Sequence, residues 1–150
     1  ANISNSVDHT NLIGTEMAFM IGPFSIQGEY VMTSVSANET FNFSSYYGQI
    51  SYFLTGEKRK YKNSFAGFDR VSPSNNIGDG GIGALELATR YSSMNLTEAD
   101  GGMLNDITVG LNWHLNSCTK IMFNYVLGTA KIENEIINEN TFQTRIQIDF

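Results

Sequence analysis

Hydrophobic and polar residues alternate along several stretches of the chain, most clearly over 141–150, which reads TFQTRIQIDF. A period of two places apolar residues on one face of an extended strand and polar residues on the other. The other stretches with this pattern are 12–21, 24–33, 45–55, 83–92, 104–115 and 120–130. We therefore predict seven strands of roughly 9 to 12 residues, the length at which a tilted strand crosses a bilayer.

The connections between these strands differ in length. Residues 22–23 and 116–117 are predicted tight turns, whereas 34–44, 93–103 and 133–140 are longer and polar. Short turns at one end of a sheet and long loops at the other are typical of outer-membrane β-barrels. Segment 56–82 is the exception, because it is long and is predicted at the short-turn end.

The two faces of the predicted strands differ in chemistry. The polar faces carry charges of both signs: Glu16, Glu29, Glu86, Arg90, Asp106, Lys120, Arg145 and Asp149. The apolar faces carry aromatic residues near strand ends: Tyr91, Trp113, Phe142 and Phe150. In a membrane barrel the charges line a wet lumen and the aromatics form interfacial girdles. In a soluble β-sandwich the charged face meets solvent instead, and the pattern leaves both folds open.

Seven strands is an odd number, whereas single-chain bacterial barrels have an even number. We therefore interpret residues 1–150 as the C-terminal part of one larger outer-membrane β-barrel domain. An eight-stranded barrel with one unrecognised strand is the alternative. The first eleven residues have no basic and apolar signal-peptide pattern, so we expect the signal and further strands to be removed from this chain.

Composition supports a β protein and narrows the possible functions. Only 16% of the residues are charged, against about 25% in soluble domains. The chain has 10 Phe, 7 Tyr and 14 Gly but only 2 Pro, which suits strands and turns. The single cysteine, Cys118, excludes an internal disulfide framework and a cysteine-based zinc site. A net charge of −6 argues against nucleic acid as a partner.

Several separate motifs resemble, in order, those of the phosphate-selective porin O and P family. They are YFLTGEKRKY (52–61), FAGFDRVSP (65–73), GALELATRY (83–91), DITVGLNWHL (106–115), MFNY (122–125) and the terminal FQTRIQIDF. The resemblance implies an all-β, 16-stranded transmembrane antiparallel barrel, of which this chain supplies the last seven strands. It also implies a homotrimeric porin in outer-membrane lipid that passes small hydrophilic solutes or anions, without catalysis or a cofactor. Some connecting segments of that family fold into the lumen, which would explain segment 56–82.

Basic residues are the candidate anion-binding or pore-lining groups. Arginine offers a two-pronged hydrogen-bonding fork to phosphate oxygens and lysine a point charge, and such a cluster facing a narrow lumen concentrates anions. The candidates are the cluster Lys58, Arg59, Lys60 and Lys62, then Arg70, and Arg90, Lys120 and Arg145 on the polar faces. The alternative for the cluster is a solvated loop.

The terminal aromatic residue and the glycine-rich stretch have separate interpretations. Phe150 ends an alternating strand and resembles the signal that the outer-membrane assembly machinery reads. Residues 78–83, GDGGIG, match the letters of a dinucleotide-binding motif, but a strand follows them instead of a helix, which indicates a turn. Two other functions stay open: a structural or adhesive barrel without transport, and an outer-membrane hydrolase with catalytic residues at its rim.

Overall fold

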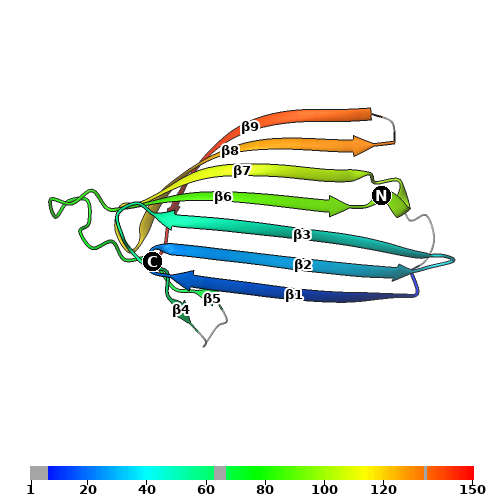
Figure 1. The fold of residues 1–150 in the computed structure, drawn as a ribbon, viewed down its shortest axis with the longest axis horizontal. Helices are drawn as coiled ribbons and strands as arrows, with labels where there is room; N and C mark the ends of the chain where they lie inside the picture. Colours follow the sequence, from blue (N-terminus) through cyan, green and yellow to red (C-terminus); the bar gives the residue numbers. More distant parts are fainter. Residues whose placement is uncertain (1–6, 63–66, 134) are drawn as a thin grey trace.

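The main feature of the molecule is one curved sheet of seven strands (Figure 1). The computed structural model describes residues 7–62, 67–133 and 135–150. The strands are β1 (His9–Ile21), β2 (Phe24–Ser36), β3 (Thr40–Phe53), β6 (Ala84–Asn95), β7 (Met103–His114), β8 (Thr119–Ile132) and β9 (Glu135–Ile148). Each pairs antiparallel with the next in the order β1-β2-β3-β6-β7-β8-β9. The predicted all-β antiparallel sheet is therefore confirmed.

The remaining elements are short. Strands β4 (Tyr61–Lys62) and β5 (Gly67–Phe68) pair as a small second sheet. A 3₁₀ turn, η2 (Thr97–Ala99), lies between β6 and β7. In the part of the chain that the structure describes, no helix is long and apolar enough to cross a membrane.

The strand register separates a polar face from an apolar face, as the alternation predicts. Residues paired directly across neighbouring strands point to the same side of the sheet. One such row across the sheet reads Ala18, Gln27, Gln49, Arg90, Thr108, Val126 and Thr141. The adjacent row, on the other side, reads Phe19, Ile26, Ile50, Thr89, Val109, Tyr125 and Phe142. We call the side of the first row the polar face and the side of the second row the apolar face.

The apolar face is exposed rather than packed against a second layer. Phe19, Ile50, Val109, Tyr125 and Phe142 are each at least 42% exposed. A continuous apolar surface of this extent is unusual for a water-soluble monomer and is expected where strands meet lipid. The fold therefore favours a membrane sheet over a soluble sandwich. Strands β1 and β9 form the two edges of the sheet, so these seven strands do not close a barrel by themselves.

Three predicted loops are wrong in their length. The predicted loop 34–44 shrinks to residues 37–39, because β2 and β3 extend toward each other. The predicted loop 93–103 shrinks to 96–102, and the predicted loop 133–140 is mostly strand, because β9 begins at Glu135. These stretches are polar, but ladder hydrogen bonds join backbone groups and do not require apolar side chains. The strands are consequently 12 to 14 residues long.

The long connection predicted at the short-turn end is confirmed and packs on the sheet. Residues 54–83, which we call the inner segment, join β3 to β6 and contain β4 and β5. They lie at the end of the sheet that also holds the β1–β2 turn (Figure 1). A small buried cluster of Phe53, Val71 and Ala84 joins the inner segment to the last residue of β3 and the first residue of β6.

Candidate functional site

The inner segment is held to the sheet at both of its ends by backbone hydrogen bonds. The Leu54 amide donates to the Leu85 carbonyl oxygen at 2.8 Å, and the Ile77 amide donates to the Leu115 carbonyl oxygen at 2.9 Å. The Leu85 amide in turn donates to the Thr55 hydroxyl at 3.0 Å. These bonds fix both ends of the segment, and between them Arg59 contacts Glu86 on the polar face.

In the first part of the inner segment, Arg59 reaches Glu86 on β6. The Arg59 Nε atom donates to Glu86 Oε1 at 3.0 Å, and Nη2 donates to the same oxygen. The guanidinium carbon lies 5.8 Å from the ring centre of Phe53 and 5.3 Å from that of Phe68. Arg59 is therefore held by a charge-assisted hydrogen-bonding pair and by two aromatic rings.

Glu86 is fully buried, and Asn112 of the neighbouring strand β7 donates a hydrogen bond to its second oxygen. Asn112 of β7 donates from Nδ2 to Glu86 Oε2 at 3.0 Å, and His114 Nε2 lies 3.6 Å from the same oxygen. Glu86 has a relative exposure of 0%. Burying a carboxylate costs free energy unless nearby charges and hydrogen bonds compensate it. The buried charge of Glu86 is therefore stable only while the inner segment keeps Arg59 beside it. His114 Nε2 is buried and has no hydrogen-bond partner among the described residues.

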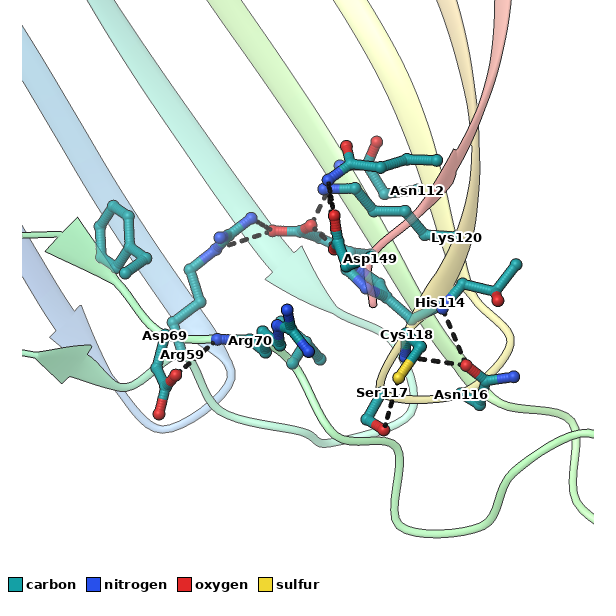
Figure 2. Close-up of a pocket in the computed structure, with 15 residues that line it drawn as sticks. Arg59, Asp69, Arg70, Asn112, His114, Asn116, Ser117, Cys118, Lys120 and Asp149 are labelled. Atoms are coloured by element: carbon teal, nitrogen blue, oxygen red, sulfur yellow. Dashed lines mark hydrogen bonds and ion pairs between the residues drawn. The ribbon is translucent and has the colours of Figure 1, made fainter.

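A cavity of about 250 Å³ opens beside this pair (Figure 2). Three cationic side chains from two parts of the chain line it: Arg59 and Arg70 of the inner segment and Lys120 of β8. Asp149, which follows β9, and Asp69 also line it. Its remaining lining residues are mostly polar and include Asn116, Ser117, Thr119 and Gln147.

Two of the three carboxylates at this cavity are paired with cations. Glu86 pairs with Arg59, and Asp69 Oδ1 lies 3.1 Å from Lys62 Nζ. Hydrogen bonds from Lys62 and from the Arg70 backbone lower the pKa of Asp69 below its ordinary value. Among the described residues, neither Arg70 nor Lys120 has a carboxylate within ion-pair distance. The cavity therefore has two cations available to solutes.

Glu57 stabilises the fold of the inner segment itself. Its carboxylate accepts hydrogen bonds from the Thr55 hydroxyl and from the Ser74 amide, the latter at 3.1 Å. Burial raises the pKa of Glu57, but these hydrogen bonds outweigh burial, so its pKa lies below the ordinary value. The ionised form of Glu57 therefore holds residues 55–57 to residue 74.

The predicted basic candidates do not form one cluster. Lys58 and Lys60 are exposed, Lys62 is paired with Asp69, and only Arg59 and Arg70 of the inner segment reach the cavity. Of the polar-face candidates, Lys120 also lines the cavity.

The remaining predicted candidates lie elsewhere. The Arg90 guanidinium stacks 4.2 Å from the ring centre of Tyr47, and Arg145 is exposed on β9. Phe150 follows β9 with an exposed side chain, and its role in assembly stays a prediction. Phe65 and Ala66 of the predicted motif lie outside the described residues.

Asn112 and His114 belong to the site but were not predicted as site residues. Glu86 was predicted only as one of the charges on the polar face. The register brings them together, since Phe53 pairs with Glu86, and Glu86 with Asn112. The period-two pattern places Glu86, Asn112 and His114 on the polar face. Once the strand pairing is known, this pattern is enough to bring the three side chains together. Across the described part of the chain, no group of three or more His, Cys, Asp or Glu residues is placed to hold a metal ion.

Comparison with known proteins identifies the family. The family described as phosphate-selective porin O and P matches residues 2–150. The chain belongs to this family. It is 35% identical over 156 residues to Porin O of Pseudomonas aeruginosa, an alignment covering 91% of this chain and 34% of that protein. It is 29% identical over 147 residues to an uncharacterised protein of Caulobacter vibrioides, covering 91% of this chain and 29% of that protein.

The family membership confirms the predicted resemblance and the outer-membrane location, because proteins of this family are bacterial outer-membrane proteins. A porin family indicates a channel rather than an enzyme. The chain spans about a third of the length of these relatives. The predicted trimer and the predicted total of sixteen strands stay predictions.

Proposed function

We propose that this chain forms part of the wall and part of the narrow passage of an outer-membrane porin that passes small hydrophilic solutes and favours anions. In this proposal the apolar face meets lipid and the polar face lines water. The inner segment lies against the polar face and narrows the passage at the short-turn end. Seven strands are too few to close the channel, so the rest of a sixteen-stranded barrel completes it.

The observation that carries the anion preference is the cavity beside the inner segment. Arg59 neutralises Glu86 and Lys62 neutralises Asp69, which leaves Arg70 and Lys120 facing Asp149 alone. A positive surplus in a narrow, water-filled site raises the local concentration of anions. The guanidinium of Arg70 also suits the oxygens of phosphate, the solute in the family's name.

Away from this cavity the polar face is acidic. Measuring whether the channel favours anions or cations therefore tests the proposal. Among the described residues of the polar face outside the cavity, the acidic ones are Glu16, Glu29, Asp106, Glu135 and Glu139, and the basic ones are Arg90 and Arg145. If these residues bordered the narrowest point instead, the channel would favour cations.

The test is the reversal potential of the full-length protein in planar bilayers under a KCl gradient. We expect anion selectivity, and we expect Lys120→Gln and Arg70→Gln each to shift the reversal potential toward cations. Lys131→Gln is the control for Lys120→Gln, since it removes the same charge from the same strand, but from the apolar face near the opposite end of β8, away from the cavity. We also expect phosphate to reduce the chloride current.

Cation selectivity of the full-length protein would overturn the anion preference. An equal shift of the reversal potential in Lys131→Gln would mean that the cavity does not determine the ion selectivity. A correctly folded protein without conductance would instead favour the structural or adhesive barrel.

A further inference from the structure

The buried Glu86 carboxylate bridges two parts of the molecule. On one side it accepts a hydrogen bond from Asn112 on the neighbouring strand at 3.0 Å. On the other side it accepts two hydrogen bonds from Arg59, in the first part of the inner segment. The negative charge of Glu86 therefore lies at the contact between the sheet and the inner segment.

Other hydrogen bonds between the inner segment and the sheet region lie near the ends of the segment. Among the described residues they involve Leu54 and Thr55 at one end and Ile77 and Ile82 at the other. Between these ends, Val71 adds packing against Phe53 and Ala84. Among the described residues, the Arg59–Glu86 pair is therefore the polar contact that joins the part of the segment between Thr55 and Ile77 to the sheet.

We propose that Glu86 is a positioning residue, which fixes Arg59 and with it the adjoining part of the inner segment against the polar face, and so sets the width of the passage. The carboxylate is fully buried, whereas the Arg59 side chain is 19% exposed. Glu86 therefore does not contact solutes itself and affects them only through Arg59. This inference rests on the proposed function, because it assumes that the polar face lines the passage.

A positioning role and a simple charge role predict different results. If Glu86 and Arg59 acted only as charges in the passage, Glu86→Gln and Arg59→Gln would shift the reversal potential in opposite directions and leave the inner segment in place. If Glu86 acts through Arg59, both variants release the segment. Both then raise single-channel conductance, and the double variant adds little to either single variant.

The experiment combines single-channel recording with hydrogen exchange on the full-length protein. The amides of Asp69 and Ser74 report on the inner segment, since they donate hydrogen bonds to Lys60 and Glu57. We expect Glu86→Gln to speed exchange at both amides about tenfold or more, the size of a lost charge-assisted hydrogen bond. Arg59→Gln should do the same, and the two changes together should do no more.

The matched control is Asp106→Asn, which also neutralises a carboxylate on the polar face. Asp106 accepts its hydrogen bonds from Ser92 and Thr108, and not from the inner segment. We expect this variant to shift the reversal potential and to leave exchange at Asp69 and Ser74 unchanged. If Glu86→Gln prevents folding, Arg59→Gln carries the test, because it alters the less buried partner.

Unchanged exchange in Glu86→Gln, or additive effects in the double variant, would overturn the positioning role. Hydrogen exchange does not depend on ion preference. If the wild-type protein favours cations while Glu86→Gln still loosens the segment, the proposed anion preference fails and the role of Glu86 stands.

Discussion

Gly83, where the inner segment enters β6, should not tolerate a side chain. Its φ of +75° lies in the left-handed region, and a Cβ there would lie 2.3 Å from the carbonyl oxygen of His114. The left-handed conformation costs a non-glycine residue about 1–2 kcal/mol. The overlap with backbone adds about 1–3 kcal/mol, as other forced overpacking does. We therefore expect Gly83→Ala to lower the free energy of unfolding by about 2–5 kcal/mol.

Gly80 offers the matched control within the same segment. Its φ of +82° carries a similar conformational cost, but a Cβ there would meet nothing within 4 Å. Gly80→Ala should therefore cost only about 1–2 kcal/mol. The assay is urea unfolding of the full-length protein in lipid vesicles, followed by tryptophan fluorescence. If the two variants agree within about 0.5 kcal/mol, the close approach of Gly83 to β7 does not contribute and the reasoning is refuted.

Two further predictions test the orientation of the sheet and the state of the inner segment. Val109→Arg puts a charge on the apolar face in the middle of β7 and should cost about 2–4 kcal/mol in vesicles, whereas Thr108→Arg on the polar face should cost far less. Equal costs would mean that the apolar face does not meet lipid. Because the folded-state pKa of Glu57 lies below its unfolded value, its stabilisation is present above the unfolded pKa and is lost as pH falls through the folded pKa. The protection factor of the Ser74 amide, the factor by which it exchanges more slowly than an unprotected amide at the same pH, should therefore fall at acidic pH, and Glu57→Gln should remove that dependence.

The strands could be predicted because their signal is local. In 83–92 and 104–115, each residue's side of the sheet follows from its position in an alternating pattern, and the structure reproduces both faces. The residues at which the strands begin and end were harder to predict from the sequence. Asn42 and Asn138 are polar, yet both belong to strands, because backbone pairing continues past the apolar stretch.

The candidate site was only partly accessible from the sequence. Arg59 was among the predicted residues, but its partner Glu86 lies 27 positions away along the chain. The intervening inner segment has no alternation that would predict its path. That path depends on backbone hydrogen bonds at its ends and on the buried cluster around Phe53, which only the folded chain brings together.

The central claim is that the cavity beside the inner segment presents positive charge to solutes in an open, water-filled passage. Cys118 lines this cavity with an exposed thiol, so its rate of modification reports the local potential directly. The measurement uses the assembled full-length protein at low ionic strength, with Cys118 as the sole reactive thiol. It compares thiosulfonate reagents that carry either a sulfonate or a trimethylammonium group. We predict that the negatively charged reagent reacts about tenfold faster and that added salt reduces the ratio. Faster reaction with the positively charged reagent, or no reaction with either, would contradict the account.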